Sequence, residues 1–119
     1  MTNPTQINWT DPTTNVDGSP VTAGEIVGYE VGVRDTSAAG SAAGSYPFGA
    51  KAPGAAVSEL ISAIPKLPTG VSLAAAVRAV TGVNDASGNP ITSAWSSEAT
   101  FTIAPPPPVP NPPTQVAVS

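Results

Sequence analysis

Eight carboxylates are the side chains of this sequence best suited to acid–base or metal chemistry. The chain has no histidine, the usual general base near neutral pH, and no cysteine, so thiolate nucleophiles, thiolate metal sites and disulfides are excluded. Asp11, Asp17 and Asp85 lie in turn-rich stretches, and a carboxylate pair or a calcium site would require them to meet across loops. Solvated loop acids are the simpler interpretation, so we expect no catalytic residue, no metal and no cofactor.

Length, charge and hydropathy restrict the class of protein. The 119 residues suit one ordinary domain with a tail. Four basic residues against eight acidic ones leave a net charge of −4 and no basic cluster, so we expect no nucleic-acid partner. No apolar run approaches the ~18 residues of a membrane span, and the first residues show no secretory-signal pattern, so we expect no membrane partner.

Alternation of apolar and polar residues is the dominant pattern, and it predicts β-strands. The stretches that alternate clearly are residues 5–10, 26–35, 71–80 and 97–103. Two weaker candidates are an edge strand at 46–48 and a strand at 57–64. Turn-rich loops at 11–25 and 81–94 separate the strands and are the natural contact surfaces. The pattern predicts an all-β fold that needs no helix.

Charged side chains stand on the polar faces of two of these strands. In the stretch 26–35, Tyr29 and alternate residues after it face one side, and Arg34 faces the other. Arg78 has the same outward position in the stretch 71–80. We expect the two arginines to pair with Glu30 or other acids on this face, as exposed pairs that stabilise the fold little.

Several motifs follow one another as they do in the fibronectin type III domain, which the chain resembles over residues 5–103. The matching positions are Trp9 with Pro12, Tyr29, Leu67 with Gly70, the run Val77, Arg78, Ala79 and Val80, and Trp95 with Ser96. The resemblance implies a seven-stranded antiparallel sandwich of two sheets, of the immunoglobulin-like class. It also implies that Trp95 is a packed structural side chain rather than a binding aromatic. Leu73 stands where the family has a corner tyrosine, so apolar packing replaces that hydrogen bond.

The family's first strand is missing from its usual place, because Met1 to Gln6 leave no room for it. Its usual pattern, prolines followed by an alternating apolar pair, describes the C-terminal sequence PNPPTQVAVS. We therefore divide the chain into a sandwich lacking its first strand (1–104), a polyproline II linker (105–113) and a donor strand (114–119). The donor residues are Thr114, Gln115, Val116, Ala117 and Val118.

The linker directs the donor strand toward another copy of the chain. Its prolines are Pro105, Pro106, Pro107, Pro108, Pro110, Pro112 and Pro113. At about 3.1 Å per residue, polyproline II geometry makes this stretch a spacer of ~30 Å that resists doubling back. We therefore expect donation in trans, to the sheet edge at Ile7 and Trp9 of a neighbouring subunit. Two alternatives stay open: insertion into the chain's own sheet, and excision from a longer protein in which this segment begins the next domain.

A donor and an acceptor on different surfaces make a heterologous contact, which yields rings, filaments or lattices. We expect a non-enzymatic structural protein that assembles head to tail with itself, with another capsid or tail protein as a further partner. By association with where lone domains of this kind occur, we expect a virion protein made in the host cytoplasm, such as a phage capsid decoration, tail or fibre protein. The alternative is a spacer or binding repeat of a secreted bacterial multidomain enzyme or adhesin, located outside the cell.

Overall fold

Seven strands and one short 3-10 helix make up the regular structure of the computed structural model, which describes residues 3–119. The elements are β1 (Gln6–Asn8), β2 (Ile26–Asp35), β3 (Phe48–Pro53), β4 (Ser58–Leu60), η1 (Ile61–Ala63), β5 (Ser72–Asn84), β6 (Pro90–Thr92) and β7 (Ala99–Thr102). Every pairing between these strands is antiparallel, so the all-β prediction is confirmed. The described residues contain no helix with the length and hydropathy that crossing a membrane requires.

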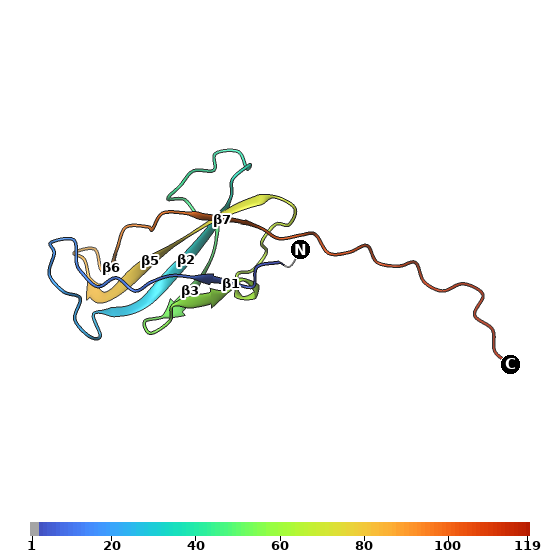
Figure 1. Cartoon of the computed structure of the whole chain (residues 1–119), viewed down its shortest axis with the longest axis horizontal. Helices are drawn as coiled ribbons and strands as arrows, with labels where there is room; N and C mark the ends of the chain where they lie inside the picture. The colour runs from blue at the N-terminus through green and yellow to red at the C-terminus, as the bar shows by residue number, and fades with distance from the viewer. Residues whose placement is uncertain (1–2) are drawn as a thin grey trace.

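The strands form two sheets (Figure 1). β1 and β4 make a two-stranded sheet, and β4 lies against β3 of the larger one. The larger sheet has the order β3-β2-β5, and both β6 and β7 pair with the far side of β5. Between β6 and β7 the chain stays beside β5 without regular pairing, because Ser93 and Ser96 donate their N–H groups to the carbonyls of Ala79 and Val77.

The core lies on the face of the larger sheet that the small sheet covers. The residues of β2 and β5 that belong to this core are Tyr29, Val31, Val33, Leu73, Ala75, Val77 and Ala79. They alternate along each strand, as the period of two predicted, and Ile7 and Trp9 pack against them from the chain around β1. Leu73 is fully buried, so the position that we expected to be held by apolar packing is part of this core.

The strand boundaries differ from the prediction in three places. The stretch 57–64 is a strand only at Ser58–Leu60 and then turns into η1, where the N–H of Ile64 bonds to the carbonyl of Ile61. The edge strand expected at 46–48 is β3, which begins only at Phe48 and continues to Pro53. It extends this far because pairing with β2 overrides the weak strand propensity of residues 49–53. The loop expected at 81–94 contains the end of β5 and all of β6, which a tight turn at residues 85–88 connects.

The C-terminal segment extends away from the folded body (Figure 1). Residues 114–119 form no strand in the single chain, and Val116 and Val118 are 86% and 98% exposed. The segment leaves the folded body close to the start of β1. There the N–H of Ala104 bonds to Oδ1 of Asn3, just before β1, at 2.9 Å. We call this end of the body the tail end, and the opposite end, formed by the loops 11–25 and 81–94, the loop end.

Candidate functional site

One edge of β1 is open. The N–H of Trp9 bonds to the carbonyl of Val57 at 2.9 Å, and the N–H of Ile61 bonds to the carbonyl of Thr5 at 3.0 Å. Since backbone groups alternate along a strand, Gln6 and Asn8 direct theirs away from β4. No strand of residues 3–119 pairs with them there. An added strand would therefore bond to Gln6 and Asn8.

This geometry refines the acceptor edge expected at Ile7 and Trp9. Their side chains pack on the core, and the N–H of Trp9 is already engaged by Val57. The two residues therefore supply the apolar surface of the edge, while the residues that alternate with them supply its hydrogen bonds. Sequence periodicity identified the apolar side chains, but the choice of bonded edge depends on which side β4 occupies.

A hollow of about 190 Å³ lies beside Trp9, and we call it the Trp9 crevice. It is lined by Trp9, Thr10, Pro12, Tyr29, Val77, Arg78, Ala79, Ser93, Ala94 and Ser96. One wall is thus the chain that continues β1, and the other is the irregular segment between β6 and β7. A second hollow, of about 210 Å³, opens at the loop end and shares Pro12, Ala79 and Ser93 with the first. The two hollows therefore adjoin.

The ring of Trp9 packs against an aromatic neighbour, but its indole N–H makes no hydrogen bond within residues 3–119. Its ring lies 5.2 Å from that of Tyr29, centre to centre. Tyr29 in turn donates its hydroxyl to Asp11 at 2.5 Å, and burial together with this hydrogen bond raises the pKa of Tyr29 to about 12. The indole N–H of Trp9 is buried and has no acceptor among the described residues. A buried donor without an acceptor is costly, so this N–H marks Trp9 as a position of incomplete hydrogen bonding.

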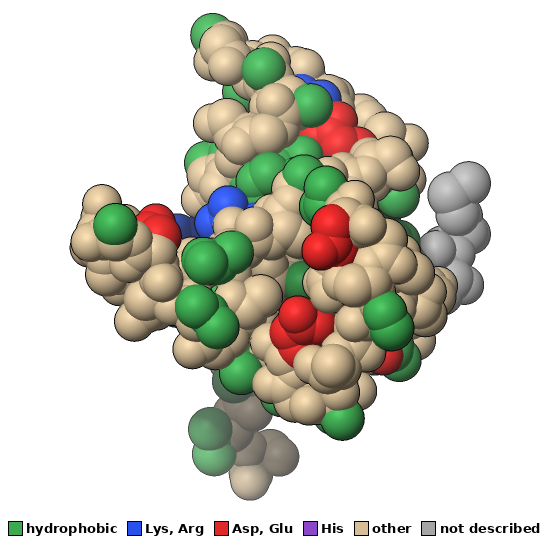
Figure 2. Space-filling model, turned by 90° about the vertical axis from the view of Figure 1, so that its left-hand side faces the viewer, with side chains coloured by type: hydrophobic (Ala, Val, Ile, Leu, Met, Phe, Trp, Pro, Cys, Tyr) green, Lys and Arg blue, Asp and Glu red, His purple; other side chains and the backbone are tan. Residues whose placement is uncertain are grey.

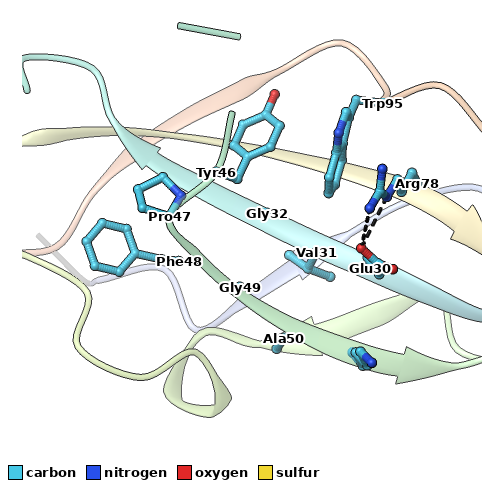
Figure 3. Close-up of a pocket in the computed structure, with 11 residues that line it drawn as sticks. Glu30, Val31, Gly32, Tyr46, Pro47, Phe48, Gly49, Ala50, Arg78 and Trp95 are labelled. Atoms are coloured by element: carbon cyan, nitrogen blue, oxygen red, sulfur yellow. Dashed lines mark hydrogen bonds and ion pairs between the residues drawn. The ribbon is translucent and has the colours of Figure 1, made fainter. Parts of the chain in front are cut away.

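The other tryptophan, Trp95, lines a hollow on the outer face of the larger sheet, away from the core (Figure 3). We call it the outer-face hollow. It measures about 350 Å³, and Gly32 and Gly49 form part of its lining. Trp95 lies there between two partners, with the ring of Tyr46 at 4.7 Å and the guanidinium of Arg78 at 4.5 Å. Arg78 also bonds to Glu30 at 2.8 Å, as expected from the sequence.

Glu98 connects the two segments that cover this outer face. Arg34 donates two hydrogen bonds of 2.7 Å to its carboxylate, and the hydroxyl of Tyr46 donates a third at 2.9 Å. These contacts, with those of Arg34 first, lower the pKa of Glu98 to about 2 against the opposing effect of burial. We name Arg34, Tyr46, Arg78, Trp95 and Glu98 the outer-face cluster. Its aromatic and polar groups bond to one another, which supports the packed role expected for Trp95.

The three loop acids do not meet. The carboxylate of Asp17 accepts bonds from the N–H and the hydroxyl of Ser19, and that of Asp85 accepts the N–H groups of Ser87 and Asn89. Asp11 bonds to Tyr29, as described above. Each acid thus stabilises its own turn or strand contact, and residues 3–119 hold no group of three or more potential metal ligands.

The loop end, formed by residues 11–25 and 81–94, presents a mixed surface. Figure 2 views this end, where acidic side chains are set among hydrophobic ones. Val16, Val27, Val83 and Ile91 are largely exposed. The mixture is typical of a contact surface more than of a charged ligand site.

No protein-family model matches this chain, and no curated protein or solved structure is significantly similar to it.

Proposed function

We propose that this chain is a non-enzymatic structural module that links copies head to tail by donating residues 114–118 to the open edge of β1 in a neighbour. The observation that carries the proposal is that the chain has both a free tail and an open strand edge that such a tail could fill. The tail projects from the folded body with both valines exposed, and the edge of β1 is open beside the Trp9 crevice. Strand addition is the common way in which an open sheet edge takes an extended segment.

The direction of the tail favours a neighbour over the chain's own sheet. A strand antiparallel to β1 must enter at the loop end, because β1 itself starts at the tail end. The chain's own tail begins at the tail end and would have to travel the whole body length before turning back. A copy that presents its loop end to this tail receives the segment along a straight path, which suits a stiff polyproline linker.

The donor segment suits the ladder that it would join. It contains no proline after Pro113, so every residue from Thr114 onward offers an N–H group. With Val116 and Val118 facing the core, Ala117 faces solvent and its backbone lies opposite Asn8. Each valine contributes about 1.5 to 3 kcal/mol when fully buried. One such link is modest, so repetition along an assembly would matter.

The strand order supports a fibronectin type III-like sandwich as the body of the module. Trp9, Tyr29, Arg78 and Trp95 occupy the strands or connections on which the family pattern was recognised, and the position beside β1 is where the family's first strand would pair. We propose a virion setting, as a phage capsid decoration, tail or fibre protein. The alternative, an excised spacer or binding repeat of a secreted bacterial enzyme or adhesin, predicts a chain that does not associate with itself.

Light scattering on the full chain over a range of concentrations tests the proposal. We expect the mean mass to rise with concentration and to fall to that of a monomer in Val116→Asp/Val118→Asp, because two charges cannot enter the core face. Ala117→Asp is the matched control and should still associate, since its side chain would face solvent. A full chain that stays monomeric, or equal behaviour of the two variants, would contradict strand donation.

A further inference from the structure

We propose that the proline linker is itself a ligand: in the assembly, residues 110–113 of one copy bind as a polyproline II segment across the Trp9 crevice and the adjoining hollow at the loop end of the next copy. The inference rests on the proposed function for the placement of the tail. It goes beyond it because the linker becomes a recognised part of the contact instead of a spacer.

The register of the donated strand brings the prolines to the crevice. If Val116 lies opposite Trp9, then Val118 lies opposite Ile7, because antiparallel strands run in opposite directions. Continuing upstream, Pro113 comes level with Pro12. Pro12 lines both the Trp9 crevice and the adjoining hollow at the loop end. Pro113 therefore lies at the Trp9 crevice, and residues 110 and 111, level with Asn15 and Thr14, lie over the adjoining hollow.

The chemistry of the crevice fits a proline-rich segment. Its aromatic side is the Trp9–Tyr29 pair, and its opposite wall has only the small side chains of Ser93, Ala94 and Ser96. Grooves lined by aromatic residues bind polyproline II segments because the ligand is already ordered and presents flat apolar rings. Proline has no backbone N–H, so burying it leaves carbonyls as its only backbone polar groups.

The unpaired indole N–H of Trp9 is the complement of such carbonyls. It is a buried donor without an acceptor among the described residues, and it belongs to the side chain that lines the crevice. A polyproline II backbone has free carbonyls, since it makes no internal hydrogen bonds. Because this N–H has no solvent access in the single chain, its hydrogen bond to a linker carbonyl requires the Trp9 ring to turn toward the crevice on binding.

The outer-face hollow is the weaker candidate for the same ligand, although it is larger. Trp95 already contacts Tyr46 and Arg78, and the hydroxyl of Tyr46 bonds to Glu98. The hollow also has the charged groups of Glu30 and Lys51 in its lining, in addition to Arg78, which lines both hollows. A linker without charges gains little from these groups, and it would have to leave the path toward β1 to reach them.

Nuclear magnetic resonance of the indole N–H groups tests the inference on the full chain. The receptor is ¹⁵N-labelled full-length Val116→Asp/Val118→Asp, whose own donor strand is inactive. The probes are peptides of residues 104–113, of residues 104–119, and of residues 104–119 with alanine at positions 110, 112 and 113. We expect the first two peptides to shift the Trp9 signal and to leave that of Trp95 in place.

Affinities give the expected sizes of the effects. The alanine-substituted peptide should bind about tenfold more weakly than the native 104–119 peptide, since it loses preorganisation and ring contacts. Trp9→Phe, which keeps a ring but lacks the N–H, should weaken binding about three- to tenfold. Ala94→Phe should block the crevice without disturbing the core, because Ala94 is exposed, and Ala86→Phe is its control outside the crevice.

The outcomes separate this inference from the proposed function. Equal affinity of the native and alanine-substituted 104–119 peptides, with no effect of Ala94→Phe, would overturn linker binding and leave strand donation intact. Binding of the 104–113 peptide as tight as that of residues 104–119 would support linker binding and contradict strand donation. Failure of all three peptides to bind would overturn both.

Discussion

The two tryptophans of this protein lie beside hollows of different kinds. Trp95, on the outer face, has an aromatic neighbour, a cationic neighbour and a network that ends on Glu98. Trp9, at the open edge of β1, has one aromatic neighbour and an N–H without an acceptor. This difference supports the proposed partner site at Trp9 over one at Trp95. The larger hollow is therefore not the better candidate for function.

Small residues on the outer face of the larger sheet allow aromatic side chains to pack closely against it. Ala74 and Ala76 alternate with the core residues of β5 and so face the outer side, yet they are only 1% and 2% exposed. Gly32 lies in the same face, and Tyr46 sits directly over it. Small side chains on β2 and β5 thus let an aromatic layer approach the sheet closely.

Replacing Trp95 should give the largest effect of the changes that test this comparison. Trp95→Ala removes the partner of both Tyr46 and Arg78 and should lower the free energy of unfolding by about 2 to 4 kcal/mol. Urea denaturation measures this loss. Binding of the 104–119 peptide should be unchanged in the folded variant. Loss of peptide binding by a folded Trp95→Ala would show that the two tryptophans are not separate in function.

Adding one methyl group at Gly32 should displace the aromatic layer. A Cβ there would lie 2.6 Å from Cγ of Tyr46, so the ring must move. We expect Gly32→Ala to destabilise the fold by about 1 to 3 kcal/mol in urea denaturation. Gly82→Ala is the control, because its Cβ would meet only the exposed side chain of Val27, at 3.2 Å, and should cost less. Equal effects of the two changes would mean that Tyr46 is not tightly packed.

Acid should weaken the outer-face cluster before the core. The pKa of Glu98 is lowered from 4.5 to about 2, so its contribution to stability is present above pH 4.5 and is lost as the pH falls toward 2. Glu98→Gln cannot ionise. Its melting temperature should lie below that of the native protein at pH 7, and the gap should narrow between pH 4.5 and 2. A gap that stays constant over this range would exclude an ionic role for Glu98.

The Glu30–Arg78 pair should contribute least. Both side chains are 30% exposed, and exposed pairs contribute about 0.2 to 1 kcal/mol. We expect Glu30→Gln to lower stability by less than ~1 kcal/mol, with high salt reducing the difference further. Arg78 keeps its contact with Trp95 in this variant. A larger loss would mean that Glu30 holds Arg78 over the indole ring.

The regular part of the fold could be predicted because its strands alternate. β2 and β5 alternate between the core and the outer face, so their core residues follow from the period of two, whereas the buried Ala74 and Ala76 on the outer face do not. β3 and β6 were placed poorly because their sequences are short and rich in Gly, Ala or Pro. Their position depends on pairing with β2 and β5, which no local pattern encodes.

The sites show the same limit. Ile7 and Trp9 were found from periodicity, but the open side of β1 depends on where β4 pairs. The Arg34–Glu98 contact joins residues 64 positions apart, so only the folded chain reveals it. One local signal was available for the aromatic layer: Gly32 is a glycine inside an alternating strand, and such a glycine often marks a close approach by another group.

The position of the tail has a consequence for growth. Because it leaves at the tail end and a donated strand must enter at the loop end, every link in the proposed assembly has the same polarity. A string of copies would then end in a vacant groove on one side and a free tail on the other. Two different molecules would therefore limit its length. A copy with an inactive tail would bind the free tail and stop growth at that end, and a soluble tail peptide would fill the vacant groove and stop growth at the other.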